Sequence, residues 1–408
     1  MNDSLLNKLV KKFTASVYSI IFLCNVVGCG SVSKTTGNPD KKNISETKLK
    51  IKLKGGETHL YSINLNAGEF VHIKATQYGI DVMAKVTKAN GEGENIFDSP
   101  TGELGEEDIY LEGTPAGSKY QIEIYPAQKY ADQGEYVISI VRLDKESETD
   151  KKWMAALAST QKADKLRARS DTRLESVQQY ELAAAEWMAL KDTVQYASTM
   201  RSLGFGLIRL KNYEKAVNIF SQLLPIWNQV RDIRSEGFTY LIIGRIYDLQ
   251  KKYKQALDEN LNSLEYWIKS KDVDQESFTL MNVGDLYIQL SDKQKAINSF
   301  EQALKKNESS ERPSIKAVIL RDYATAMLSI GENEHAVQLY EQSLKQWKLT
   351  INTPEEARTA FLLAAYYDEK KNRKEAIQFY CNALGIWQKL GEQTEINKIQ
   401  ALLEKLGK

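Results

Sequence analysis

The second half of the chain repeats itself every forty residues. One phase of this repeat holds a small residue, a second an alanine and a third a leucine, and a fourth holds tryptophan except where Asn307 replaces it. A repeat of this length indicates supersecondary units that complete their hydrophobic core only by stacking on one another. The small-residue series is Gly204, Gly244, Gly284, Ala324 and Ala364, and the tryptophan series is Trp227, Trp267, Trp347 and Trp387.

Within each unit the apolar residues follow helical offsets. Ala216, Phe220 and Trp227 fall at i, i+4 and i+11, which is one face of a helix. A pair of helices with Gly or Ala at a close crossing resembles the tetratricopeptide repeat, whose usual period is about 34 residues. The longer period favours a longer second helix that ends at the tryptophan. We expect five units over 193–392, a helix pair before them over 147–192 and a capping helix over 393–408.

Residues 48–143 have a period of two. Apolar residues alternate with polar ones in short runs such as 61–65 and 136–141, and glycine-rich breaks separate the runs. This pattern predicts a small all-β sandwich or jelly roll. Segments 56–63, 65–70, 79–82 and 134–136 resemble the bacterial pre-peptidase C-terminal β-sandwich, which implies an accessory domain without catalysis. The expected fold class is therefore multidomain, with this β-sandwich followed by an all-α tetratricopeptide superhelical solenoid.

Three aspartates of the β-region have two interpretations. Asp81, Asp98 and Asp108 can be read as cation ligands or as turn and edge carboxylates. We favour the second interpretation and expect no metal site, because the Asp-x-Asp-x-Asp spacing of a calcium loop is missing.

Residues 1–28 have the form of an export signal. Three lysines precede sixteen uncharged residues, 13–28, a stretch too short to span a membrane as a helix. Val26-Val27-Gly28-Cys29 resembles a bacterial lipobox, which implies that Cys29 is acylated and anchors the exported chain, and the absence of Asp after it implies outer-membrane sorting. The alternative is an uncleaved anchor with Cys29 incidental. The polar residues 29–47 are typical of a flexible tether.

Composition argues against two functional classes. Lys and Arg total 55 against 54 Asp and Glu, so the net charge of +1 lacks the cationic field that nucleic-acid binding needs. Three Cys and three His leave little material for metal or nucleophile chemistry, so we expect no cofactor. A hydrolase using the β-domain would need an acid pair or a nucleophile beside a base, and we find neither in the sequence. We therefore expect a protein that is not an enzyme.

The order of these parts suggests a larger family. A lipobox, this β-sandwich type and repeats with Trp-x4-Asp linkers, such as Trp227 to Asp232, resemble the N-terminal region of bacterial CHAT-domain proteins. In that family a caspase-like Cys/His protease often follows the repeats. This chain ends where that domain would begin, and its late Cys381 and His335 fall in different helix pairs. The resemblance implies an envelope scaffold or, alternatively, the regulatory part of a CHAT-type protease system whose protease is encoded elsewhere or lost.

The first helices of stacked tetratricopeptide pairs commonly line a concave peptide-binding face. The mixed charge of the residues projected onto that face suits a protein or peptide partner better than a polyanion, although solvated helix faces would look the same in the sequence. The tryptophan series can be read as a stacking platform for sugars or bases, but its phase with the core leucines favours packing between units. The projected residues are Arg201, Arg209, Arg245, Asp248, Asp285, Gln289, Arg321 and Asp368.

Overall fold

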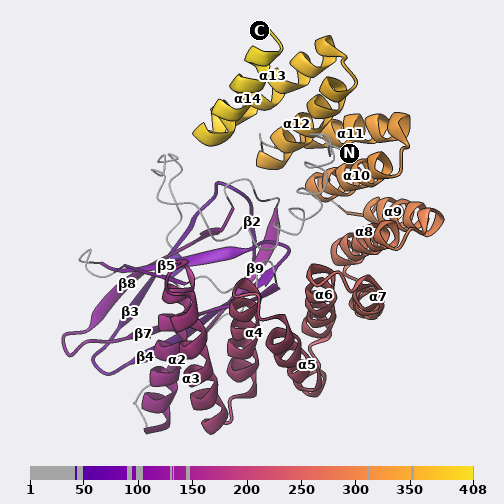
Figure 1. Cartoon of the computed structure of the whole chain (residues 1–408). Helices are drawn as coiled ribbons and strands as arrows, with labels where there is room; N and C mark the ends of the chain where they lie inside the picture. The colour runs from indigo at the N-terminus through magenta and orange to yellow at the C-terminus, as the bar shows by residue number, and fades with distance from the viewer. Residues whose placement is uncertain are drawn as a thin grey trace. The chain divides into compact units, whose positions relative to one another are not determined.

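The computed structural model describes residues 42–43, 49–89, 94–97, 104–128, 131, 133–143, 148–310, 312–350 and 353–407. The β-strands come first in the chain and the helices follow (Figure 1). The chain divides into two compact units at a point inside the helix Ile233–Leu249. The first unit ends at Ile246 and the second unit begins at Tyr247. This architecture confirms the expected fold class, a β-domain in two sheets followed by a tetratricopeptide-like helical array.

The described strands of the first unit form two sheets. The five-stranded sheet has the order β1-β3-β8-β5-β6 and the four-stranded sheet the order β2-β9-β4-β7. Neighbouring strands are antiparallel, except that β1 runs parallel to β3. Their bounds are β1 Lys42–Asn43, β2 Leu49–Leu53, β3 His59–Leu65, β4 Phe70–Tyr78, β5 Val82–Lys88, β6 Glu94–Phe97, β7 Leu104–Glu112, β8 Ser118–Pro126 and β9 Gly134–Leu143.

One hydrophobic core is shared by the two sheets. Ile63 and Ile122 of the five-stranded sheet are buried in the same cluster as Ile73 and Ile138 of the four-stranded sheet. The alternation seen in the sequence therefore places one face of each strand in a common interior, as in a β-sandwich.

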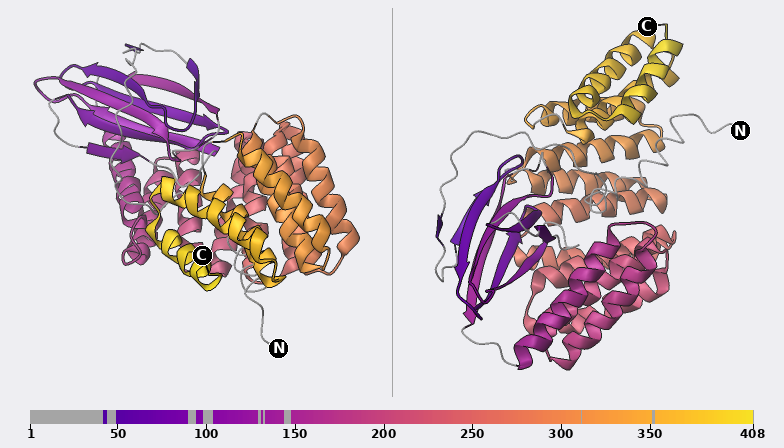
Figure 2. Two further views of the ribbon diagram at one scale, coloured as in Figure 1. Left: turned by 90° about the horizontal axis from the view of Figure 1, so that it is seen from above. Right: turned by 90° about the vertical axis from the view of Figure 1, so that its left-hand side faces the viewer.

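Helical hairpins follow the strands at the period that the sequence predicts. The described residues contain thirteen helices, and those of the second unit stack as successive antiparallel pairs (Figure 2). Their bounds are α2 Glu148–Arg167, α3 Arg173–Ala189, α4 Thr193–Arg209, α5 Tyr213–Val230, α6 Ile233–Leu249, α7 Tyr253–Ser270, α8 Val273–Gln289, α9 Lys293–Asn307, α10 Pro313–Ser329, α11 Asn333–Trp347, α12 Pro354–Glu369, α13 Arg373–Leu390 and α14 Gln393–Lys405.

Most of the described turns between helices share one backbone geometry. The N–H of Asp232 donates to the carbonyl of Trp227 at 2.9 Å, and the Asp232 carboxylate accepts a hydrogen bond from the N–H of Ser235 at 3.0 Å. One aspartate thus closes the last turn of α5 and caps the start of α6. Residues with a left-handed backbone mark these turns at intervals of twenty or forty: Lys191, Lys211, Arg231, Lys251, Lys271, Ser291, Gly331, Lys371 and Gly391.

Small residues lie where paired helices cross. A Cβ atom added to Gly204 would lie 2.6 Å from the ring of Phe220, and one added to Gly284 would lie 2.8 Å from the ring of Phe300. Each glycine therefore leaves room for an aromatic ring on the second helix of its own hairpin.

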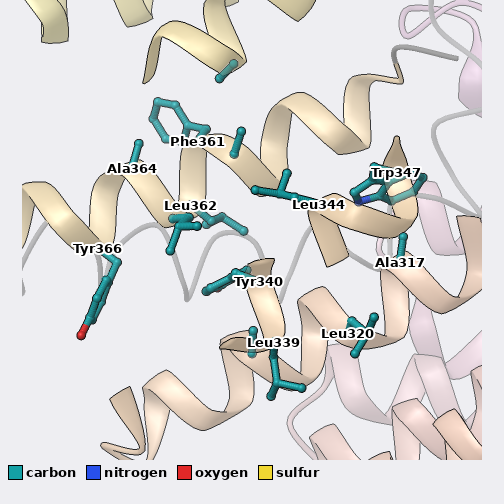
Figure 3. Packing of buried hydrophobic residues seen from close by; sticks show 14 of the residues in the cluster. Ala317, Leu320, Leu339, Tyr340, Leu344, Trp347, Phe361, Leu362, Ala364 and Tyr366 are labelled. Carbon is teal, nitrogen blue, oxygen red and sulfur yellow. The ribbon is translucent and has the colours of Figure 1, made fainter. Parts of the chain in front are cut away.

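The tryptophans of the repeat lie inside the array. All four side chains of the series are at most 4% exposed. In the second unit one buried cluster runs from Leu280 to Leu403, and Figure 3 shows Tyr340 and Trp347 of α11 within it. This burial matches the packing interpretation and leaves no open indole face for stacking a ligand.

Candidate functional site

The predicted arginines of the first unit are partly or fully packed against the fold. Arg201 on α4 is only 5% exposed, and its guanidinium lies over the ring of Trp227, 5.6 Å from the centroid. Arg209 is half-buried and donates to the carbonyl of Arg167 at 3.4 Å. Arg245 is half-buried on α6. Arg201 therefore differs from the expected open position, because its guanidinium packs against an aromatic face.

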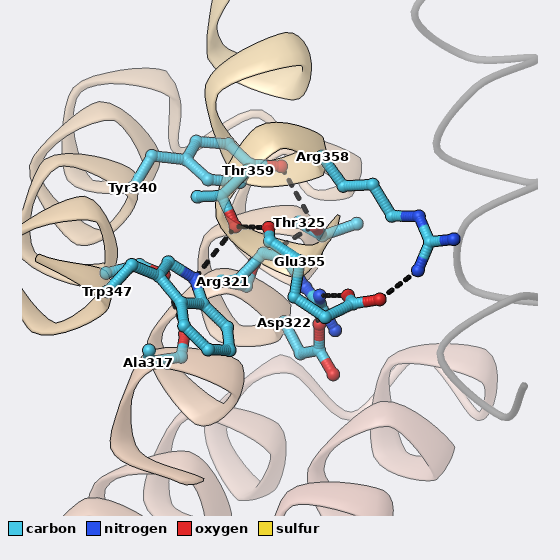
Figure 4. Close-up of polar contacts among 10 residues, drawn as sticks. Ala317, Arg321, Asp322, Thr325, Tyr340, Trp347, Glu355, Arg358 and Thr359 are labelled. Carbon is cyan, nitrogen blue, oxygen red and sulfur yellow. Dashed lines mark hydrogen bonds and ion pairs between the residues drawn. The ribbon is translucent and has the colours of Figure 1, made fainter. Parts of the chain in front are cut away.

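In the second unit a group of charged side chains lies on helices that begin successive hairpins. Arg321 on α10 is 3% exposed; its Nε donates to Oδ1 of Asp322 at 2.8 Å, and its Nη1 pairs with Oε2 of Glu355 on α12. Arg358, also on α12, pairs with the other oxygen of Glu355 (Figure 4). We call Arg321, Asp322, Glu355 and Arg358, with the neighbouring Asp285 of α8, the charged cluster. Arg321 was expected on an open face, but these ion pairs hold it in the interior.

Hydroxyl groups tie the helices of the cluster together. Oγ1 of Thr325 donates to the carbonyl of Arg321 at 3.0 Å and shares a hydrogen bond of 2.8 Å with the hydroxyl of Tyr340 on α11. Nε1 of Trp347 donates to Oγ1 of Thr359 at 3.1 Å (Figure 4). Hydrogen bonds to side chains of α11 thus hold both α10 and α12, the two helices that the ion pairs join.

Two carboxylates of the cluster, those of Asp285 and Asp322, have raised pKa values. Burial raises the pKa of Asp285 well above its ordinary value, the nearby Asp322 and Asp248 add to this, and Arg321 opposes it. Burial also raises the pKa of Asp322, although Arg321 acts the other way. For Arg321 burial lowers the pKa, but the carboxylates of Asp322 and Glu355 outweigh it and raise the pKa above its ordinary value. At both carboxylates the effect of burial on the pKa therefore outweighs that of the Arg321 charge.

The other predicted groove residues of the second unit are more accessible. Asp248, near the end of α6, is half-buried, and Gln289 at the end of α8 is exposed. Asp368 is half-buried near the end of α12, where it adds to the effect of burial in raising the pKa of the Tyr380 hydroxyl.

The remaining predicted sites give no further chemistry. Asp81 is buried, and the part of the chain that the structure describes holds no group of three or more His, Cys, Asp or Glu able to bind a metal ion. Across the same residues, none of the helices combines the length and the apolar character that crossing a bilayer requires. Cys29, Asp98, the predicted signal and the predicted tether, apart from the two residues of β1, lie outside the described residues.

Sequence reasoning missed three members of the charged cluster. Asp322, Glu355 and Arg358 were not among the projected residues, because only the inward positions of the repeat class were considered. The repeat gave only a weak signal for Asp322, because its phase is mixed: Ser202 and Asn282 are polar there, and Ile242 and Leu362 are apolar. Asp322 is the one charged residue in that phase.

Comparisons with known proteins agree with the helical geometry. A family model of the tetratricopeptide repeat matches residues 279–309, which span the second half of α8 and all of α9. A search of curated proteins finds no match. The chain therefore contains a tetratricopeptide-repeat array.

Several solved structures are similar to this chain. Aspartyl phosphate phosphatase F from Bacillus subtilis is 12% identical, with 64% of this chain and 72% of that one covered and a TM-score of 0.47. A signal transduction ATPase with a tetratricopeptide repeat sensor from Pyrococcus horikoshii is 20% identical, with 59% of this chain and 38% of that one covered and a TM-score of 0.44. BtubC from P. vanneervenii is 14% identical, with 60% of this chain and 93% of that one covered and a TM-score of 0.40.

Proposed function

We propose that this protein is a non-catalytic scaffold that binds a partner protein or peptide on the inner face of its tetratricopeptide array. Stacked helical pairs create extended surfaces that neighbouring repeats share, and repeat proteins use such surfaces for binding. The observation that carries the proposal is the charged cluster, which gathers charged side chains on the first helices α8, α10 and α12.

Affinity capture with matched variants tests this binding surface. The immobilised protein is incubated with solubilised cell envelope, and the wild type is compared with the charge reversals Arg245→Glu and Asp285→Lys. Asp258→Lys is the control, since Asp258 is an exposed carboxylate on the second helix α7. We expect a partner that the wild type and the control retain and the two reversals lose, and that binds again when purified. A partner retained equally by all four proteins contradicts the proposed surface.

We also propose that acylation of Cys29 anchors the scaffold to the bacterial envelope, on the periplasmic side of the outer membrane where the cell has one. The support is the short uncharged segment that ends in Val-Val-Gly-Cys. Buried methylenes contribute about 0.8 kcal/mol each, and stable anchoring takes more than one acyl chain, as in the diacylated cysteine that a lipobox implies. Labelled palmitate should enter the wild type and be lost from Cys29→Ser. Labelling that survives this substitution contradicts the anchor site.

A second candidate function is the regulatory part of a CHAT-type protease system. The order of the parts favours it, because a two-sheet β-domain precedes the repeat array as in that family's N-terminal region. The Trp-x4-Asp linker adds nothing to this argument, since the hydrogen bonds of Asp232 explain it as turn geometry. A CHAT-domain protease recovered as the captured partner would favour this candidate over an unrelated scaffold.

A further inference from the structure

The outer face of α3 carries apolar side chains that are open to solvent. Leu174, Leu182 and Met188 are 60%, 57% and 60% exposed. Ala185 and Ala189 are also exposed, and with the two leucines they follow the helical offsets i, i+8, i+11 and i+15, which lie on one narrow face. Met188 borders this face. Apolar residues gathered in this way, rather than scattered singly, indicate an interaction surface. We call these five residues the α3 stripe.

The second helices of the five later hairpins serve as the comparison. At the repeat phases of Leu174 and Leu182 these helices have only polar or charged residues, and every one of them is exposed, as the leucines are. The phase of Leu174 holds Glu214, Lys254, Gln294, Glu334 and Lys374, and the phase of Leu182 holds Gln222, Asn262, Gln302, Gln342 and Asn382. The same hairpin therefore folds with polar residues at both positions, so packing within the array does not account for leucine in α3.

Acidic side chains lie on both sides of the α3 stripe. Glu181 lies along one edge, Glu175 and Glu186 lie along the other, and all three are exposed. None of the three forms an ion pair with another residue that the structure describes. Arg173, the one basic residue of α3, is half-buried. The exposed face of this helix is therefore apolar along its middle and negative at its edges.

This charge decides between three occupants of the face. An anionic lipid surface is unfavourable, because the glutamates repel its head groups. A second copy of the chain is also unfavourable, since a two-fold contact through this face brings the same three carboxylates together from both sides. A partner whose apolar residues are bordered by Lys or Arg complements both the stripe and its edges.

We propose that the outer face of α3 is a docking surface for an amphipathic helix of a partner protein, with Lys or Arg on both sides of its apolar stripe. Its apolar side chains cover Leu174 and Leu182, and its basic side chains face the three glutamates. The small side chains of Ala185 and Ala189 let the two helices approach closely. This surface lies on a second helix, so it is additional to the inner face formed by first helices and goes beyond the proposed function.

Two model peptides of about 18 residues, long enough to match the 17-residue α3, test the proposal. Both have leucine on one helical face, and the opposite face has lysine in one peptide and glutamate in the other. Fluorescence anisotropy measures their binding to the full-length chain. The variant Leu174→Gln/Leu182→Gln introduces a residue that later hairpins have at both phases, and the control Leu261→Gln/Ile268→Gln changes two exposed apolar residues of α7. Circular dichroism confirms that each variant is folded.

We expect the wild type and the control to bind the lysine peptide more than about tenfold more tightly than the glutamate peptide. Leu174→Gln/Leu182→Gln should weaken binding of the lysine peptide about tenfold, because two leucines no longer bury apolar surface. Glu181→Gln should weaken it about threefold, and this loss should shrink at high salt.

Three results with the peptides refute the proposal: no binding of either peptide, no preference for lysine, or equal binding of the lysine peptide to the wild type and to Leu174→Gln/Leu182→Gln. Two further results refute the proposed occupant. One is a dimer in sedimentation equilibrium that this variant dissociates, and the other is binding to phosphatidylglycerol vesicles that this variant loses. Asp285→Lys on the inner face should leave peptide binding unchanged, so this proposal and the proposed function can fail separately.

Discussion

Trp267 and Trp347 occupy the same phase of the repeat, but only one of them has a partner for its indole N–H. Both side chains are buried. Nε1 of Trp347 donates to Oγ1 of Thr359 at 3.1 Å, whereas Nε1 of Trp267 is buried without an acceptor. Phenylalanine keeps an aromatic ring and removes the N–H. We therefore predict that Trp347→Phe destabilises the second unit more than Trp267→Phe does.

The size of the difference follows from the two hydrogen-bonding states. Replacing a buried indole by a phenyl ring removes apolar contact that is worth about 1 kcal/mol at both positions. Trp347→Phe also loses a hydrogen bond worth about 1 kcal/mol, whereas Trp267→Phe relieves an unsatisfied donor that costs about 1–3 kcal/mol. We expect Trp347→Phe to lower the free energy of unfolding by about 2 kcal/mol and Trp267→Phe to change it by less than about 1 kcal/mol. Trp267→Ala, which empties the site, should cost about 3–5 kcal/mol.

Hydrogen exchange is the appropriate measurement, because repeat arrays can unfold in parts and a single melting curve then mixes several transitions. Exchange detected by mass spectrometry gives separate opening free energies for peptides from α7 and α11, and circular dichroism checks the helix content of each variant. Equal losses at the two positions, or a larger loss for Trp267→Phe, would refute the argument from the indole N–H.

Three further substitutions test other parts of the account. Because burial raises the folded-state pKa of Asp285 above 3.8, ionisation of this carboxyl weakens the fold as pH rises through the raised value. Asp285→Asn should therefore raise the melting temperature at pH 7 and lose this gain below about pH 4. A lower melting temperature of the variant at pH 7 would contradict this reasoning. Lys271 has a left-handed backbone with φ of 57°, so Lys271→Gly should stabilise by about 0.5–1 kcal/mol in thermal unfolding, and a loss would speak against strain there. Glu355→Ala leaves the buried Arg321 under-paired and should cost about 3 kcal/mol in the same assay; an unchanged melt would show that the pair is not needed.

The helical array was predictable because the residues that pack its helices together recur at a fixed spacing in the sequence. Gly204 and Phe220 meet at one crossing, and Gly284 and Phe300 meet at another. The same phases hold Ala and Tyr in the last two units, and Asn260 is the one exception in the aromatic phase, so phase alone predicts the hairpins. The turns follow a local rule, because Asp and Thr are favoured just before a helix: Asp232, Asp272 and Thr353 each accept a hydrogen bond from a first-turn N–H. These interactions join residues that are close in the sequence, so they can be predicted from one sequence alone.

The β-domain was harder to predict from the sequence, because one of its strands has a buried acidic residue. The sequence did not predict β6 and β7, and β7 has Glu107 on its buried face, 1% exposed, where its Oε1 accepts from Nε2 of Gln77 at 2.7 Å. A buried acid breaks the alternation of apolar and polar residues that identifies a strand. Its partner Gln77 lies thirty residues away on β4, so the compensation becomes visible only once the sheet has formed.

The charged cluster was hard to predict because its charged residues are buried and their partners lie on separate helices. These same features argue for a role beyond stability. The repeat already contains apolar solutions for the same phases, since Met281 stands where Arg321 does in the next unit and Leu362 stands where Asp322 does. Well-packed apolar residues of similar volume often match or exceed a buried ion pair in stability. In this chain two buried charges replace them, and an unbalanced Asp285 lies alongside. A fold that has apolar alternatives at the same positions does not need this arrangement for its own integrity, so the charged cluster argues for a role in the proposed binding function.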